Sequence, residues 1–262
     1  MKNKFVILML ALLCLSCTGK NSKKDSSVAA EDVQNKPSAV SLEFWETFSA
    51  PEDGTNPRRT SVITSKMGEA DKAVLAYYAA DSDELNYGGL LDILMVIQDE
   101  GGGVVGCVTS EHEKKIVSKF LALPEVRSCF PDEVIFMWGN RPDEFFGNLY
   151  ILYAIYDEHA DGKAPLDGSV VKEARADYSQ YGGGAEISIT MNDEGSRKWA
   201  DLTQANIGMN IAVVIDGCVY SAPRVRERIE CGSSAITGDF NMEEAEELAN
   251  RIKNGKKSMP AK

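Results

Sequence analysis

The stretch that decides the fold is Glu186–Pro260, and its first part, Glu186–Pro223, reads EISITMNDEGSRKWADLTQANIGMNIAVVIDGCVYSAP. Its first six residues, Glu186–Met191, alternate apolar and polar side chains, and this pattern predicts a half-buried strand. Asn192 or Asp193 can then cap the start of a helix, and Gly208 stands where a left-handed C-terminal cap belongs. The apolar side chains assigned to this helix are Trp199, Leu202 and Ile207.

The residues after this helix predict a hairpin. Ile211–Ile215 and Val219–Ala222 have the composition of strands, and Asp216-Gly217 between them tolerates the positive φ angles of a tight turn. Ile236–Thr237 predicts one more short strand.

A second helix completes this α/β unit. Asn241 and Glu244 have capping-box spacing, and the helix is expected to end at Gly255. Its apolar face consists of Ala245, Leu248, Ala249 and Ile252. The side chains expected to pack both helices against one antiparallel sheet are Trp199, Leu202, Leu248 and Ile252.

Strands and helices also alternate upstream of this unit. The expected strands are Leu42–Phe48, Val104–Val108, Val134–Trp138 and Leu149–Tyr156, the last two forming a hairpin. Glu69–Ala80 predicts a helix whose clustered side is Ala73, Val74, Tyr77 and Tyr78. Interspersed strands and hairpins predict the α+β class with a largely antiparallel sheet.

A further upstream helix begins with a capping box formed by Ser110 and Glu113. Pro124 is expected to end it, because proline cannot continue a helix. Its buried face is predicted to carry Ile116, Val117, Phe120 and Leu121.

The order of these caps and turns resembles the first periplasmic (head) domain of SecD, the accessory membrane subunit of the bacterial protein-export translocon, and SecD–SecF fusions of the Bacteroides type. The positions that match the family pattern are Gly195, Thr203, Asn206, Gly208, Asp216, Gly217, Ser221, Pro223, Gly238, Phe240, Glu244, Ala245, Leu248 and Gly255. Upstream, the similar stretches are Leu42–Phe48, Phe120–Gly139 and Asp161–Gly168. The resemblance implies a SecD-like head subdomain over 161–262 and an upstream part of the same periplasmic domain over 41–160.

SecD has membrane-spanning helices after this domain, whereas no apolar run near 18 residues long is found here after the predicted signal peptide. The resemblance therefore implies a head domain detached from the membrane motor. It implies contact with unfolded exported polypeptide or with Sec translocon components. The hairpin Ile211–Val225 is the expected contact region. An alternative stays open, namely a divergent structural or regulatory lipoprotein that binds another envelope protein or a small ligand.

The N-terminus predicts export and anchoring. Lys2 and Lys4 precede the apolar run Phe5–Leu15, as in a signal peptide over residues 1–16. Cys17 after this run is the expected lipidation site of a bacterial lipoprotein. Residues 17–40 are polar and free of aromatic side chains, and they are expected to form a flexible tether. We therefore expect a lipid-anchored protein of the cell envelope that faces the periplasm.

Charge and composition argue against several other functions. The chain has 40 acidic and 28 basic side chains, a formal net charge of −12, which disfavours binding to nucleic-acid phosphates. Only two histidines are present, and neither His112 nor His159 has a partner at metal-ligand spacing. His159 stands beside Asp157, Glu158 and Asp161, which is interpreted as a charged loop. No nucleophile elbow or phosphate loop is found, so we expect no enzyme activity, metal or cofactor.

Four further cysteines lie in the exported part: Cys107, Cys129, Cys218 and Cys231. Four thiols allow three pairings, which the sequence cannot rank. Sequence-local bridges 107–129 and 218–231 are one possibility, and buried free thiols are the other.

Overall fold

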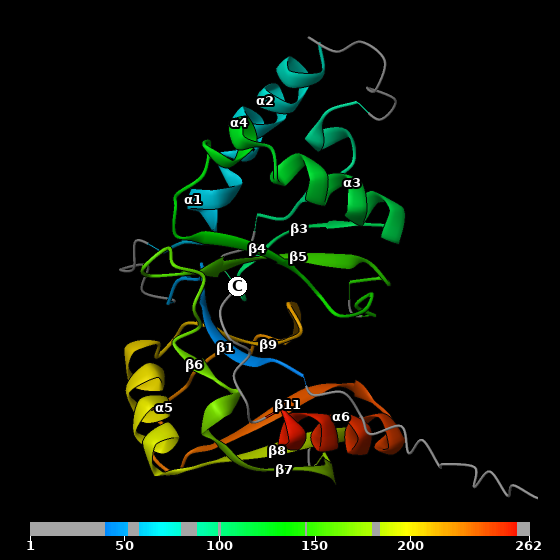
Figure 1. Ribbon diagram of the computed structural model, residues 1–262. Helices are drawn as coiled ribbons and strands as arrows, with labels where there is room; N and C mark the ends of the chain where they lie inside the picture. Colours follow the sequence, from blue (N-terminus) through cyan, green and yellow to red (C-terminus); the bar gives the residue numbers. More distant parts are fainter. Residues whose placement is uncertain are drawn as a thin grey trace, which may run out of the picture. The chain divides into compact units, whose positions relative to one another are not determined.

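The computed structural model describes residues 40–51, 58–79, 88–98, 101–144, 146–179 and 184–255, all within one compact unit. The predicted signal peptide, Cys17 and the predicted tether up to residue 39 lie outside these residues. The described part contains an eight-stranded sheet, a three-stranded sheet and the helices packed against them (Figure 1). All strand pairings within the two sheets are antiparallel, so the predicted α+β class is confirmed.

The large sheet joins segments from both ends of the chain. Its strands are β1 (Leu42–Thr47), β2 (Met95–Val96), β3 (Val104–Val108), β4 (Val134–Trp138), β5 (Tyr150–Tyr156), β6 (Leu166–Asp167), β9 (Ile211–Ile215) and β10 (Cys218–Ser221). The main order is β10-β9-β1-β5-β3-β2, with β4 paired to β5 and β6 paired to β1. The predicted hairpins β4–β5 and β9–β10 are both confirmed.

This sheet curls back toward its own edge. Gly139, directly after β4, forms a parallel bridge with Val219 in β10, and Asn140 N donates to Val219 O at 3.0 Å. The curl encloses an apolar cluster built from Trp45, Ile155, Ala212, Val214 and Val219. The turn that makes β9–β10 possible has Asp216 at φ 50° and Gly217 at φ 77°, as the dipeptide predicts.

The small sheet has the order β11-β8-β7, with β7 Val171–Tyr178, β8 Ala185–Met191 and β11 Ser233–Phe240. A one-turn helix, η2 (Gly168–Val170), leads into β7. The strand β11 is longer than the predicted Ile236–Thr237 and contains a register shift between Ile236 and Phe240.

Two capped helices, α5 (Asp193–Ala205) and α6 (Met242–Asn254), accompany the small sheet. Asn192 Oδ1 accepts from Gly195 N at 2.8 Å, and Asn241 and Glu244 form the predicted capping box. Gly208 has φ 82°. Ile207 lies beyond the end of α5 and is exposed, so its assignment to the apolar face of that helix is wrong.

The core around α5 and α6 contains residues of both sheets. The expectation that both helices pack against a single sheet is therefore corrected. Phe44 of β1 and Trp199 of α5 pack with ring centroids 5.1 Å apart. The same apolar cluster includes Val213 from β9 and Ile187 from the small sheet. The reason is geometric: β9 follows α5 in sequence but pairs with β1, which places the helix against two sheets.

The upstream helices cover another part of the large sheet. They are α1 (Thr60–Thr64), α2 (Met67–Ala79), η1 (Leu90–Asp92), α3 (Glu111–Leu121) and α4 (Pro124–Arg127). The four predicted core residues of α3 are all buried. On the predicted side of α2, Val74 is buried and Ala73 and Tyr78 pack against the core, whereas Tyr77 is exposed. The expectation that Pro124 ends α3 is wrong, because α3 ends at Leu121 and Pro124 is the first residue of α4.

Candidate functional site: a groove beside β11

A groove of about 610 Å³ lies between the loop Pro223–Ile229 and the first residues of β11. Its apolar lining includes Trp199 from α5 and Val213 from β9. Charged side chains of the loop also line it: Arg224, Arg226 and Glu227. An apolar lining flanked by charges of both signs suits a ligand with mixed side chains better than a small anion.

The loop is held in place by its main chain. Val225 N donates to Met209 O, and Gly208 N donates to Val225 O, both at 2.8 Å. Farther along, Ile229 N donates to Thr203 Oγ1 at 3.0 Å. These bonds tie both ends of the loop to α5 and the residues after it, so one side of the groove is preformed.

The opposite side of the groove is the small sheet, which contributes Arg175 of β7, Ser188–Thr190 of β8 and Ser233–Ala235 of β11. The open edge of this sheet on the groove side belongs to β11. Met191 N donates to Gly232 O at 2.8 Å, so the main chain of Gly232 faces β8. Along an antiparallel strand the N–H and C=O groups of successive residues point alternately to one side and the other. Ser234 and Ile236 therefore also direct their N–H and C=O groups to β8. The N–H and C=O of Ala235 therefore point away from β8. Neighbouring edge carbonyls are already engaged, since Trp199 Nε1 donates to Ser233 O at 3.1 Å and Arg141 donates to Asp239 O.

A buried polar network supports the helix that lines the groove. Asn206, at the end of α5, is fully buried, and its Nδ2 donates to Glu46 Oε1 at 2.8 Å and to Leu202 O at 2.9 Å. Arg58 Nη1 lies 2.8 Å from the same Glu46 oxygen, and Nη2 donates to Asn206 Oδ1 at 3.0 Å. The guanidinium also lies 4.5 Å from the ring centroid of Tyr156. These contacts fix the end of α5 relative to β1.

Asn210 makes a second link between the large sheet and the loop. Its N–H donates to Ser49 Oγ at 3.0 Å, and its Nδ2 donates to Ala222 O at 2.7 Å, directly before the loop. The Asn210 carbonyl accepts from Thr47 Oγ1 at 3.0 Å. Resemblance pointed to Asn206, whereas Glu46 and Asn210 were missed. The available signal for Glu46 was its place directly after Phe44 and Trp45, in a predicted strand with large apolar side chains.

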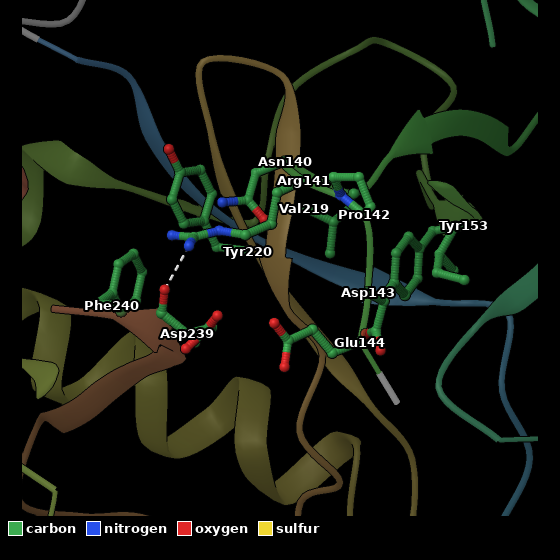
Figure 2. Close-up of a pocket in the computed structure, with 13 residues that line it drawn as sticks. Asn140, Arg141, Pro142, Asp143, Glu144, Tyr153, Val219, Tyr220, Asp239 and Phe240 are labelled. Carbon is green, nitrogen blue, oxygen red and sulfur yellow. Dashed lines mark hydrogen bonds between the residues drawn. The ribbon is translucent and has the colours of Figure 1, made fainter. Parts of the chain in front are cut away.

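A separate pocket of about 340 Å³ lies at the far end of β11 (Figure 2). Arg141 lies 5.3 Å from the ring centroid of Phe240 and donates to Asp239 O, while Glu144 and Asp239 direct carboxylates toward the same space. Burial, together with the charge of Asp143, raises the pKa of Tyr153 to about 12. This phenol is therefore neutral at physiological pH and is not a proton acceptor there.

His159 and its acidic neighbours lie in the turn after β5. Within the described ranges, no three His, Cys, Asp or Glu side chains cluster as a metal site requires. Asp157 is buried and accepts from Gly162 N at 2.7 Å, so it holds the turn after β5. Beside it, hydrogen bonds from Lys163 hold the pKa of Asp161 below its usual range. His112 lies in the first turn of α3, away from His159 in sequence.

The four described cysteines are free thiols in this structure. Burial raises the pKa of Cys107 in β3. Cys231 is exposed, and hydrogen bonds from Ser233 lower its pKa. The proposed 107–129 and 218–231 bridges stay a prediction about the oxidised protein.

None of the helices in the described ranges is both long and apolar enough to cross a membrane.

Comparison with known proteins gives the same family as the sequence motifs. The family model described as the SecDF P1 head subdomain matches residues 157–260. The chain is 37% identical over 172 residues to protein translocase subunit SecD of Rhodothermus marinus, covering 64% of this chain and 26% of the relative. It is 39% identical over 182 residues to SecD of Acidaminococcus fermentans, covering 70% of this chain and 39% of the relative.

The chain thus spans about a quarter to two fifths of these relatives' length. A solved structure of SecDF, described as a membrane component that enhances protein export, aligns with 82% of this chain and 93% of that chain, with 21% identity and a TM-score of 0.35. The resemblance to the periplasmic head of SecD is confirmed by the family model and the SecD relatives.

Proposed function

We propose that this protein is a non-enzymatic accessory domain of protein export that binds extended, exported polypeptide in the groove beside β11. The match of residues 157–260 to the SecDF P1 head subdomain supports a role in export. The observation that carries the proposal is the main chain of Ala235, which faces a groove with apolar lining.

Extended polypeptide fits this site for a physical reason. A strand edge binds a partner chain through main-chain hydrogen bonds, which give affinity with little sequence preference. Pro223 and Ile229 line the groove and are not buried, so they can contact alternate side chains of the bound segment. Trp199 and Val213 lie beneath them as buried residues, and the charged loop side chains remain near solvent. Binding is expected to be weak, because ordering a disordered partner consumes much of the interaction free energy.

We further propose that the protein acts from a membrane surface through a lipid on Cys17, with residues 17–40 as the tether and the folded part facing the periplasm. A tether of this length has a root-mean-square reach of roughly 25–30 Å as a flexible chain. The groove would then meet polypeptides that emerge near the membrane. Binding needs neither ATP nor a proton gradient in this proposal.

The test is a titration of the protein, from Ser41 onward, with a reduced unfolded exported protein and with its folded form. We expect binding of the unfolded form only. Ala235→Pro should weaken it at least several-fold, since proline removes the outward N–H and is tolerated where a strand edge faces solvent. Ala176→Pro on β7, the opposite edge of the small sheet, is the matched control and should bind like wild type.

Equal affinity for folded and unfolded forms, or no binding at high micromolar concentration, would remove the polypeptide-binding proposal. Such a result would favour the alternative, which is a divergent lipoprotein that binds another envelope protein or a small ligand. The pocket at Arg141 and Glu144 is then the place to look for a small ligand.

A further inference from the structure

The strand β7 is the outermost strand of the small sheet and, among the described strands, pairs only with β8 (Figure 1). Its eight residues read VKEARADY. A strand of this length with one unpaired edge is a template for a further strand, and soluble proteins usually protect such edges. The charged side chains along β7 determine which partner strand can pair with this open edge.

The direction of each main-chain group follows from the turn after β7. Ser179 N donates to Gly184 O at 3.0 Å, and the β7–β8 register continues from this pair. Because hydrogen-bonded and non-hydrogen-bonded pairs alternate in an antiparallel ladder, the residues that face β8 are Glu173, Arg175 and Asp177. The residues that direct N–H and C=O to the open edge are Ala174, Ala176 and Tyr178.

The side chains follow the same alternation. Ala174, Ala176 and Tyr178 share one face of the sheet, and Glu173, Arg175 and Asp177 share the other. Arg175 and Asp177 form an ion pair within β7 at 3.2 Å, and their side chains are 64% and 42% exposed. Tyr178, at the end of the strand, is 76% exposed. The open edge therefore carries alternating charges on one face and an uncovered aromatic ring on the other.

We propose that two copies of this chain associate through antiparallel pairing of their β7 edges about a two-fold axis at Ala176. In this register Ala176 faces its own counterpart, and Ala174 of each copy faces Tyr178 of the other. Arg175 of each copy lies opposite Asp177 of the other, which makes two complementary cross-strand charge pairs. The exposed Tyr178 ring gains a neighbour across the interface.

Other registers fit less well. An axis at Arg175 places the two Arg175 side chains opposite each other and Glu173 opposite Asp177, which is repulsive. An axis at Ala174 would place Lys172 opposite Ala176 of the other copy. The register with β8 shifts between Val171 and Glu173, so the regular alternation of β7 does not extend to Lys172. A two-fold axis that falls between two residues is excluded. It would place a residue whose N–H and C=O point to the open edge opposite a residue whose N–H and C=O point to β8. The charge pattern thus favours a second copy over an arbitrary peptide.

The mature chain is to be examined by sedimentation velocity at increasing concentration into the high micromolar range. A strand-on-strand contact is small, so we expect a reversible monomer–dimer equilibrium. Ala176→Pro should shift the protein to monomer, because it removes an outward N–H and leaves the β8 pairing intact. Ala235→Pro is the matched control and should dimerise like wild type.

A charge exchange tests the register itself. Arg175→Asp alone and Asp177→Arg alone should each be monomeric, because like charges then face each other. A mixture of the two variants should form a heterodimer, since every cross-strand pair becomes complementary again. Circular dichroism checks that each variant is folded.

Wild-type protein that stays monomeric at the highest concentration would overturn the proposal. So would a mixture of the two variants that stays monomeric while wild type dimerises. The two proline variants keep this inference separate from polypeptide binding, because each proline is expected to affect one activity only. Arg175 also lines the groove, so the charge exchange is read by dimerisation alone.

Discussion

Arg58 and Glu46 form an ion pair at 2.8 Å, with side chains only 15% and 10% exposed. The pair is shared with Asn206, which bonds to both partners, so β1 and the end of α5 are joined across a sequence separation of 160 residues. This network lies behind the helix that contributes Trp199 to the groove. It therefore links the stability of the fold to the geometry of the proposed binding site.

Arg58→Ala is expected to destabilise the protein strongly. Removing one partner leaves the Glu46 carboxylate buried without its cation, which costs about 3–5 kcal/mol in comparable buried pairs. The free energy of unfolding from denaturant titration measures the loss. Lys66→Ala is the matched control, because the Lys66–Glu69 pair is exposed and such pairs contribute about 0–1 kcal/mol. Equal effects of both substitutions would show that the buried network is not stabilising.

Leu248→Ala should cost about 2–5 kcal/mol, the range for a large-to-small change in a core. Leu248 is buried in the cluster that contains residues of both sheets. The neighbouring Glu247 is exposed, and Glu247→Ala should change the free energy of unfolding little. An unchanged melting curve for Leu248→Ala would contradict the packing of α6 described above.

Local chemistry made most individual elements predictable. The capping boxes at Ser110 and Asn241 and the turn at Asp216-Gly217 depend on residues within a few positions of one another. Their geometry is therefore encoded in short windows of sequence. The same holds for the four buried residues of α3, whose spacing matches one face of a helix.

The relations between elements could not be predicted in the same way. Glu46 meets Asn206, and Gly139 meets Val219, only because distant strands pair, and such pairing leaves no local signal. The sequence indicated the hairpin Ile211–Val225 as a contact region but did not predict a groove. Its other side, Ala235, depends on which edge of β11 stays open, and that is settled by the sheet order.

Cys17→Ser should stop lipid attachment, and most of the protein should leave the membrane fraction or remain unprocessed. Lipoprotein modification adds more than one acyl chain, and two chains hold a protein on a membrane where one does not. Cell fractionation followed by mass spectrometry of the N-terminal peptide measures both effects. Cys14 lies inside the apolar run of the predicted signal peptide, three residues before Cys17, and Cys14→Ser is the matched control that should fractionate like wild type. Normal cleavage and membrane association of Cys17→Ser would contradict the lipoprotein hypothesis.

The thiols should differ in reactivity in reduced, native protein. Cys231 is exposed and its pKa is lowered by hydrogen bonds from Ser233, so a larger fraction is thiolate at a given pH than in an ordinary cysteine. Cys107 is buried and its pKa is raised, so both access and ionisation oppose reaction. We expect Cys231 to be alkylated first and to keep reacting as the pH is lowered, and Cys107 to react last.

Peptide mass spectrometry after timed alkylation gives the order of these reactions. Ser233→Ala should raise the pKa of Cys231 and move its reaction profile to higher pH, while leaving Cys107 unchanged. The same peptides from unreduced protein test the predicted bridges, since a 218–231 disulfide would make Cys231 unreactive until a reductant is added. Four alkylatable thiols in unreduced, denatured protein would exclude both bridges, and a fast Cys107 would contradict its buried position in β3.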